Sequence, residues 1–131
     1  MTATQARRER LRARPEDAIQ RAVVLHYQQR RASGVFMFSV PNGGYRRSIE
    51  AAIMRGTGTV AGVPDTIWIK GGRVYALELK APGGRVSANQ LATIAAMEDA
   101  GAYTAIAEGL DAALAALEAW GMLRGRAGCT P

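Results

Sequence analysis

Apolar residues recur at helical spacing in four parts of the chain and form short runs of β character in four others. Helices are predicted over about residues 15–31, 46–55, 87–100 and 110–120, where apolar side chains return every three or four positions. Strands are predicted over about 35–40, 66–70, 73–81 and 103–107, which are bounded by glycine, proline or other turn residues. The order α–β–α–β–β–α–β–α predicts an α/β fold with a central mixed β-sheet flanked by helices.

The helical segments carry recognisable faces and ends. In the first helix Glu16 precedes the apolar stripe on the same face, so a carboxylate is expected on the side that packs inward. The stripe consists of Ile19, Ala22, Val23, His26 and Tyr27. Ile49, Ala52 and Ile53 are expected to face inward from the second helix. Ser87 and Gln90 form a capping-box pattern that predicts the start of the third helix.

Glycines mark two loops of different kinds. Gly71-Gly72 lies between two apolar runs, which predicts a tight hairpin between strands 66–70 and 73–81. The stretch from Gly56 to Gly62 matches neither dinucleotide-binding nor P-loop spacing and leads into a strand rather than a helix. We expect these glycines to permit sharp turning or close backbone approach, and we expect no organic cofactor.

The segment from Asp65 to Lys80 carries the candidate chemistry. Side chains alternate along a strand, so Glu78 and Lys80 share one face while Leu77 and Leu79 take the other. A strand that is apolar on both sides should be central and covered, and charges there are costly unless they are paired or bind something. Hairpin pairing across Gly71-Gly72 places Asp65 opposite about Glu78, so two carboxylates and a lysine are expected to converge.

Two interpretations of this convergence remain open. Close carboxylates repel each other, and Mg²⁺ relieves the repulsion because it takes carboxylates and water as ligands. Lys80 would then orient water or neutralise charge on a phosphate, and Glu16 could complete the metal site. Alternatively, Lys80 forms a buried salt bridge with Glu78 or Asp65 that has only a structural role.

Composition narrows the class of partner and the organisation. The 131 residues fit one domain, and the net charge of +6 favours a polyanionic partner such as nucleic acid. No run approaches the roughly 18 apolar residues of a membrane span, and the only cysteine is Cys129, so a cytoplasmic location is expected.

Residues 1–14 contain five arginines and are interpreted as a flexible basic arm. Residues 15–123 are interpreted as the folded domain and 124–131 as a flexible tail. The arm either follows a phosphate backbone or is a solvated leader without a role.

Several motifs in order resemble a known family. Pro64-Asp65, twelve residues, then Glu78-Leu79-Lys80 resembles the signature of the PD-(D/E)XK nuclease superfamily, whose core is restriction-endonuclease-like. More narrowly, the chain resembles the VRR-NUC family over about residues 15–108. The other matching pieces are Glu16 with Gln20, Pro41-Asn42-Gly43-Gly44, the loop from Gly58 that ends Gly-Val-Pro-Asp65, and Ser87 to Gln90.

The resemblance implies a nuclease domain that hydrolyses DNA phosphodiester bonds with Mg²⁺ or Mn²⁺. Asp65, Glu78, the Leu79 carbonyl and Glu16 would hold the metal, and Lys80 would be the catalytic lysine. Gln90 matches a glutamine that touches the site, although it could act only as a helix cap. With no room for additional domains, the chain is similar to stand-alone viral and bacterial members, which implies a homodimer that cuts branched DNA such as four-way (Holliday) junctions. Two symmetric cuts suit a two-fold dimer, and the location would be the host cytoplasm for a phage-encoded chain.

The candidate DNA contacts are a loop rich in backbone donors followed by cations, and one arginine past the catalytic strand. They are Asn42, Gly43, Gly44, Arg46, Arg47 and Arg85. His26, the only histidine, is interpreted as structural. Six further apolar residues exceed what the elements require, and most are expected in the core: Phe36, Phe38, Met54, Trp68, Trp120 and Met122. Two alternatives are a nuclease acting on flaps, ends or duplex DNA, and a DNA-binding module that has lost catalysis.

Overall fold

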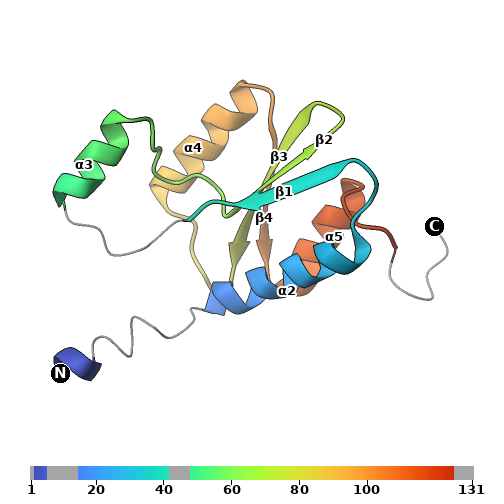
Figure 1. Ribbon diagram of the computed structural model, residues 1–131, viewed down its shortest axis with the longest axis horizontal. Helices are drawn as coiled ribbons and strands as arrows, with labels where there is room; N and C mark the ends of the chain where they lie inside the picture. The colour runs from blue at the N-terminus through green and yellow to red at the C-terminus, as the bar shows by residue number, and fades with distance from the viewer. Residues whose placement is uncertain (1, 6–14, 42–47, 126–131) are drawn as a thin grey trace.

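The eight predicted elements are present in the predicted order in a computed structural model, which describes residues 2–5, 15–41 and 48–125 (Figure 1). Their boundaries agree with the predicted ones to within two residues. The elements are α2 (Pro15–Arg30), β1 (Val35–Ser39), α3 (Ser48–Gly56), β2 (Thr66–Lys70), β3 (Arg73–Lys80), α4 (Ala88–Asp99), β4 (Tyr103–Glu108) and α5 (Leu110–Ala119).

The four strands form one mixed sheet in the order β1-β2-β3-β4. The β1–β2 and β2–β3 pairs are antiparallel, and β4 pairs with β3 in parallel after the crossover through α4. Gly71 and Gly72 both have positive φ angles, 59° and 75°, as a two-residue hairpin turn requires. The hairpin pairs Thr66 with Leu77, which confirms the predicted register and sets Asp65 beside Glu78 at the far end from the turn.

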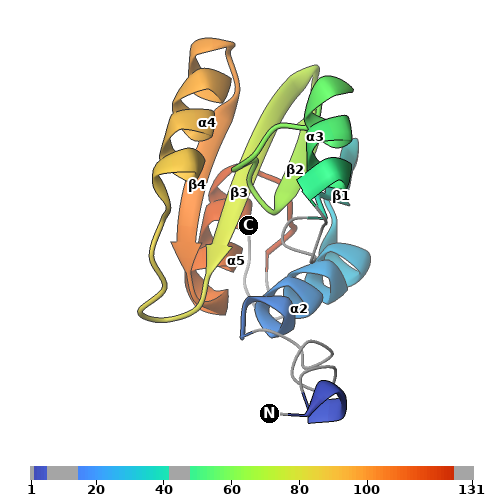
Figure 2. The ribbon, with the colours of Figure 1, turned by 90° about the vertical axis from the view of Figure 1, so that its left-hand side faces the viewer.

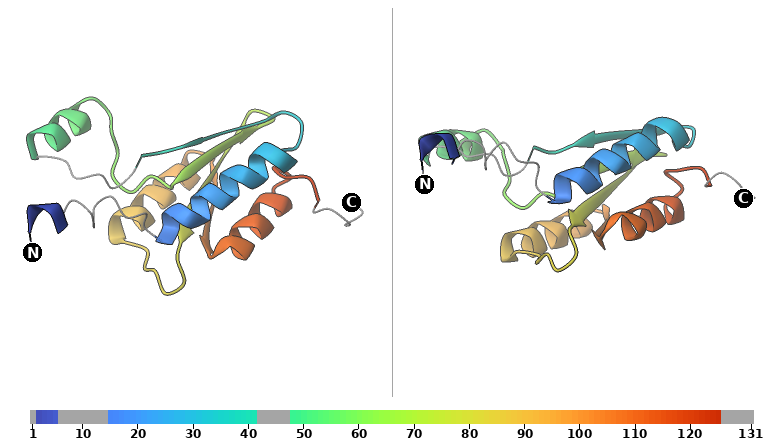
Figure 3. Two further views of the ribbon diagram at one scale, coloured as in Figure 1. Left: turned by 60° about the horizontal axis from the view of Figure 1, so that its bottom comes forward. Right: turned by 90° about the horizontal axis from the view of Figure 1, so that it is seen from below.

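The main core lies between the sheet and the helices α2 and α5, which run side by side on one face (Figure 3). Trp68 is fully buried there, meets Tyr27 of α2 edge-on and donates a hydrogen bond from Nε1 to Thr66 Oγ1. Leu77 and Leu79 fill this side as predicted. Met122 is also buried in the core, and the Ala32 amide donates to its carbonyl. The end of the described chain is thereby attached to the end of α2.

The helix α4 covers part of the opposite face, next to β4 (Figure 2). Ala76, Glu78 and Ile94 are buried on this side. The helices α2 and α5 cover one face of the sheet, and α4 covers part of the other. The inner end of β3 is therefore enclosed on both sides, which explains its apolar sequence. This arrangement confirms the prediction of a sheet flanked by helices.

The inward orientation predicted for α3 is wrong. Ile49 and Ile53 are 69% and 61% exposed, and Ala52 is exposed as well. Figure 1 shows α3 beyond the ends of the strands, away from the core. Helical periodicity identifies an apolar face but not the surface that will cover it. Two of the six additional apolar residues, Phe36 and Phe38, are likewise exposed rather than in the core.

Within the described ranges, no helix combines the length and apolarity that crossing a membrane would need.

Candidate active site

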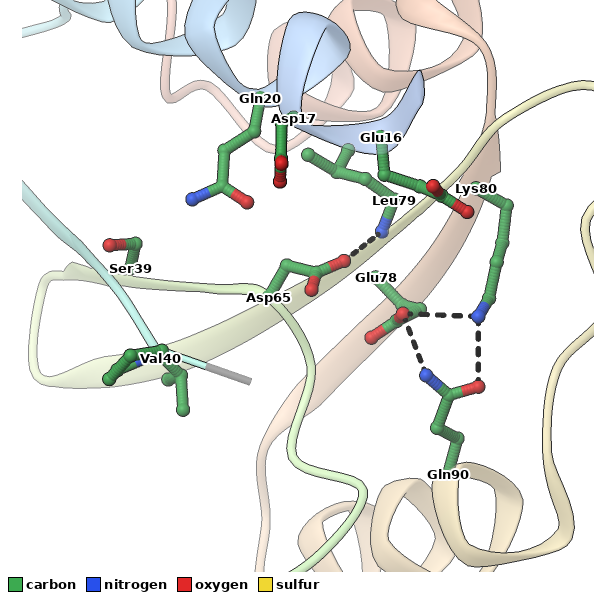
Figure 4. Close-up of a pocket in the computed structure, with 11 residues that line it drawn as sticks. Glu16, Asp17, Gln20, Ser39, Val40, Asp65, Glu78, Leu79, Lys80 and Gln90 are labelled. Atoms are coloured by element: carbon green, nitrogen blue, oxygen red, sulfur yellow. Dashed lines mark hydrogen bonds and ion pairs between the residues drawn. The ribbon is translucent and has the colours of Figure 1, made fainter. Parts of the chain in front are cut away.

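A cleft of about 360 Å³ opens where the start of α2 faces the adjoining ends of β1, β2 and β3 (Figure 4). Its lining is mostly polar and includes all five residues predicted to be catalytic. The lining residues are Glu16, Asp17, Gln20, Ser39, Val40, Pro41, Asp65, Glu78, Leu79, Lys80 and Gln90.

Asp65 is held in place by both neighbouring strands. The Leu79 amide donates to Asp65 Oδ2 at 2.9 Å, and the Val40 amide donates to the Asp65 carbonyl at 2.8 Å. Pro64, immediately before it, is buried. Because these bonds are made to fixed backbone groups, the Asp65 carboxylate has a defined position at the mouth of the cleft.

Glu78 is almost completely buried, with 2% of its surface exposed. Its Oε1 accepts from Gln90 Nε2 at 2.9 Å and lies 3.5 Å from Lys80 Nζ. Its Oε2 is buried without a hydrogen-bond partner among the described residues. Burial and then the negative charge of Asp65 raise the pKa of Glu78 to about 7, against the opposing effect of Lys80.

Gln90 links α4 to the two charged residues of β3. Its Oε1 accepts from Lys80 Nζ at 3.0 Å and from the Ser87 amide at 2.9 Å, while its own backbone amide donates to Ser87 Oγ at 3.1 Å. The predicted capping box is therefore present. The same side chain contacts Glu78 and Lys80, so capping and contact with the site, considered above as alternatives, occur together.

Two consecutive carboxylates approach the cleft from the first turn of α2. Glu16 lines the cleft, as predicted, and Figure 4 shows it on the Lys80 side. Asp17 also lines the cleft and points in beside Gln20. Asp17 was not among the residues predicted for the site. Its position next to Glu16 was the available signal.

The donor set of the cleft fits a hard divalent cation. In the described part of the chain, no three acidic, histidine or cysteine side chains form a group that would hold an ion by themselves. Asp65 and Glu78 nevertheless flank the same space, and the partnerless Glu78 Oε2 is a buried acceptor that an ion would satisfy. Mg²⁺ is commonly held by one or two carboxylates with water and substrate phosphate oxygens, which is the chemistry available here.

The predicted DNA-contacting residues are only partly described by the structure. Asn42, Gly43, Gly44, Arg46 and Arg47 lie outside the described residues. Arg85 is exposed in the loop between β3 and α4 and does not line the cleft.

His26 is also outside the cleft lining. Its Nδ1 accepts from Arg30 Nη1 at 3.0 Å within α2, which fits its structural interpretation.

The chain has a mixed four-stranded sheet flanked by helices, a fold that it shares with solved structures. Two of these structures are described as VRR-NUC domains, and the likeness is one of fold. One, described as "VRR_NUC domain protein", has a TM-score of 0.68 and 22% identity over 84% of this chain and 90% of its own. The other, described as "VRR_NUC domain", has a TM-score of 0.55 and 16% identity over 82% of this chain and 97% of its own. No family model and no curated protein matches the chain. The predicted resemblance is confirmed at the level of the fold.

Proposed function

We propose that the chain is a VRR-NUC nuclease, a metal-dependent endonuclease that hydrolyses phosphodiester bonds in DNA. The observation that carries the proposal is the convergence of Asp65, Glu78 and Lys80 in one cleft, in a domain with the VRR-NUC fold. The net charge of +6 supports a polyanionic substrate.

Each residue of the cleft has a proposed role that follows from its surroundings. Asp65, Glu78, the Leu79 carbonyl and Glu16 would hold Mg²⁺ or Mn²⁺, which when bound lowers the pKa of a water and stabilises negative charge on the scissile phosphate. Lys80 holds its ammonium group at the rim, where it donates to a water or phosphate oxygen. Gln90 fixes the position of Lys80 Nζ through a 3.0 Å hydrogen bond.

A purely structural salt bridge accounts less well for the same geometry. The Lys80–Glu78 pair is present at 3.5 Å, but it leaves Glu78 Oε2 buried without a partner among the described residues. Asp65 adds a second carboxylate that raises the pKa of Glu78 instead of relieving its burial. A pair selected for stability alone would not retain this repulsion, since buried charges cost free energy unless they are satisfied.

We further propose that the substrate is branched DNA, such as a four-way junction, and that the enzyme acts as a homodimer. Two cuts placed symmetrically across a junction require two active sites, and a two-fold dimer supplies them. Flaps, ends or plain duplex are the alternative substrates. Asn42, Gly43, Gly44, Arg46, Arg47 and Arg85 remain the candidates for contacts with the DNA backbone.

Cleavage of a labelled four-way junction and a matched linear duplex tests the proposal. The wild type, Glu78→Gln and Asp99→Asn are compared with Mg²⁺, with Mn²⁺ and with a chelator; Asp99 is an exposed carboxylate of α4 outside the cleft. We expect metal-dependent paired cuts in the junction from the wild type and Asp99→Asn, and a loss of at least about 100-fold in Glu78→Gln, a typical cost of removing a group that stabilises the transition state.

Other outcomes separate the alternatives. Equal cutting of junction and duplex would keep the nuclease and remove the preference for branched DNA. If the folded wild type binds DNA without cutting either substrate, the chain is a DNA-binding module. A metal-binding site is checked separately, because Mn²⁺ should raise the melting temperature of the wild type but not of Glu78→Gln.

A further inference from the structure

Part of the sheet surface carries apolar side chains that no described element covers. Phe36, Phe38, Ile69 and Val74 are 60%, 43%, 37% and 37% exposed. Phe36, Ile69 and Val74 are direct cross-strand partners, and the rings of Phe36 and Phe38 lie 6.3 Å apart. All four therefore form one patch, which we call the open sheet face, on the side of the sheet that carries α4.

A second uncovered apolar surface lies on α3. Ile49 and Ile53 are one turn apart and more than 60% exposed, and we call this pair the α3 stripe. Figure 1 shows α3 beyond one end of the strands, whereas the β2–β3 hairpin that borders the open sheet face is at the other end. Both the stripe and the face are exposed, so neither covers the other in this conformation.

We infer that a second copy of this chain covers both surfaces, with the α3 stripe of each copy packed on the open sheet face of the other. A two-fold rotation places the α3 stripe of each copy on the open sheet face of the other, so the same contact forms twice. This is the self-complementary arrangement of an isologous dimer. A helical ridge of Ile side chains against a Phe-containing sheet face is an ordinary form of core packing.

The area involved is sufficient for a stable dimer. The exposed parts of the six side chains amount to roughly 600 Å² per copy, so two copies remove roughly 1,200 Å² from water, which is the lower end of the range for specific interfaces. The surrounding backbone would add to this value.

The interface also has a consequence for the active site. The loop that leaves α3 leads directly to Pro64 and Asp65, and it is fastened to α4 by Thr93 Oγ1, which donates to the Ala61 carbonyl. A partner that holds α3 would therefore hold one end of the loop that positions a proposed metal ligand. The inference deepens the homodimer part of the proposed function, but it rests on the two surfaces and needs neither metal nor DNA.

The test measures molar mass by light scattering over a range of protein concentrations, with folding checked by circular dichroism. The wild type should have twice the mass of the 13.9 kDa chain. Phe36→Glu and Ile53→Lys should each be monomeric, because each places a charge in the buried contact. Leu25→Glu is the matched control: Leu25 is 55% exposed on α2, which covers the other face of the sheet, so this variant should stay dimeric.

Mixing the two monomeric variants tests whether the α3 stripe of one copy contacts the open sheet face of the other. A mixed dimer has one contact between unmodified surfaces and one in which the two introduced charges, which have opposite signs, face each other. Phe36→Glu with Ile53→Lys should therefore form a dimer that neither variant forms alone.

A monomeric wild type at every concentration overturns the inference. A dimer that survives Ile53→Lys overturns the role of α3, and dissociation by Leu25→Glu alone places the interface elsewhere. Because mass and cleavage are read separately, either proposal can fail without the other.

Discussion

At the scale of single residues, Glu78 is subject to opposing electrostatic effects. Burial and Asp65 favour its neutral form, whereas Lys80 favours the carboxylate, and the result is a pKa of about 7. In the metal-free protein Glu78 therefore keeps its proton to a higher pH than an exposed glutamate does. A cation that requires the carboxylate must displace this proton, so metal binding should strengthen as the pH rises.

The first prediction concerns the stability of the metal-free protein between pH 5 and pH 8. The pKa of Glu78 is raised on folding from 4.5 to about 7, so its stabilising contribution is present below pH 4.5 and lost as the pH rises through 7. The loss is at most about 3 kcal/mol of unfolding free energy. In Glu78→Gln this loss should be absent. Urea unfolding with a chelator at both pH values measures it, and parallel pH profiles for the two proteins would contradict the raised pKa.

The second prediction separates the two roles of Gln90. Ser87→Ala removes only the cap and should cost about 1 kcal/mol of stability with cleavage largely retained. Gln90→Ala removes the cap partner and also the bonds to Glu78 and Lys80, so a similar loss of stability should come with a loss of kcat of at least about tenfold. Equal kcat values in the two folded variants would mean that Gln90 acts only as a cap.

At the scale of elements, the loop between α3 and β2 depends on one close approach. Gly62 has a φ of 84°, and a Cβ there would lie 2.5 Å from the Asn89 carbonyl oxygen at the start of α4. The expectation that this glycine-rich stretch permits close backbone approach is confirmed. Because the contact is with backbone, no side-chain movement can relieve it, and the loop that ends at Asp65 is fixed against α4.

Gly62→Ala should therefore destabilise the protein more than Gly58→Ala. Gly58 has a φ of 101° but open space around its Cα, so an alanine there meets only the backbone cost of roughly 1 kcal/mol. At Gly62 the steric clash is added, and we expect a total loss of roughly 3 kcal/mol. Thermal unfolding of the two variants measures the difference. Equal losses would show that the loop moves away from α4 at little cost.

The elements were predictable where the sequence signal and the contact that it specifies lie close together along the chain. The Gly71-Gly72 hairpin, the Ser87 cap and the alternation from Leu77 to Lys80 are local signals, and they brought Asp65, Glu78 and Lys80 together correctly. The position of α3 was not predictable, because an apolar helix face does not show whether the surface that covers it belongs to the same chain or to another one. The same reason explains the exposure of Phe36 and Phe38. Asp17 was not predicted, because neighbouring helical residues point in different directions and only the three-dimensional start of α2 shows that both Glu16 and Asp17 line the cleft.

At the scale of the whole molecule, the positive charge is unevenly distributed along the sequence. Residues 1–14 contain five arginines and one glutamate, which together supply four of the six net positive charges. Pro15, the next residue, begins α2, whose first turn lines the cleft. The basic segment is thus joined to the domain next to the proposed catalytic site rather than at a remote surface.

Deletion of residues 2–14 tests whether these charges contact DNA. If they do, the logarithm of the binding constant should fall with the logarithm of salt concentration less steeply in the deleted protein, by up to about 4 in slope. Binding is measured with Glu78→Gln in both lengths, so that no DNA is cut. Identical slopes would show that the segment is a solvated leader that does not bind DNA.

The attachment of the first helix to the last residues has a consequence for synthesis on the ribosome. Val23 of α2 is buried in the same core as Leu117, and the Arg30 carbonyl accepts from the Arg124 amide. The helix that brings Glu16 to Asp65 and Glu78 therefore lacks one of its packing partners until residues 110–124 have emerged. A chain that stops before residue 110 holds all of the proposed catalytic residues but only part of the core that assembles them, so the proposed cutting activity should require residues 110–124.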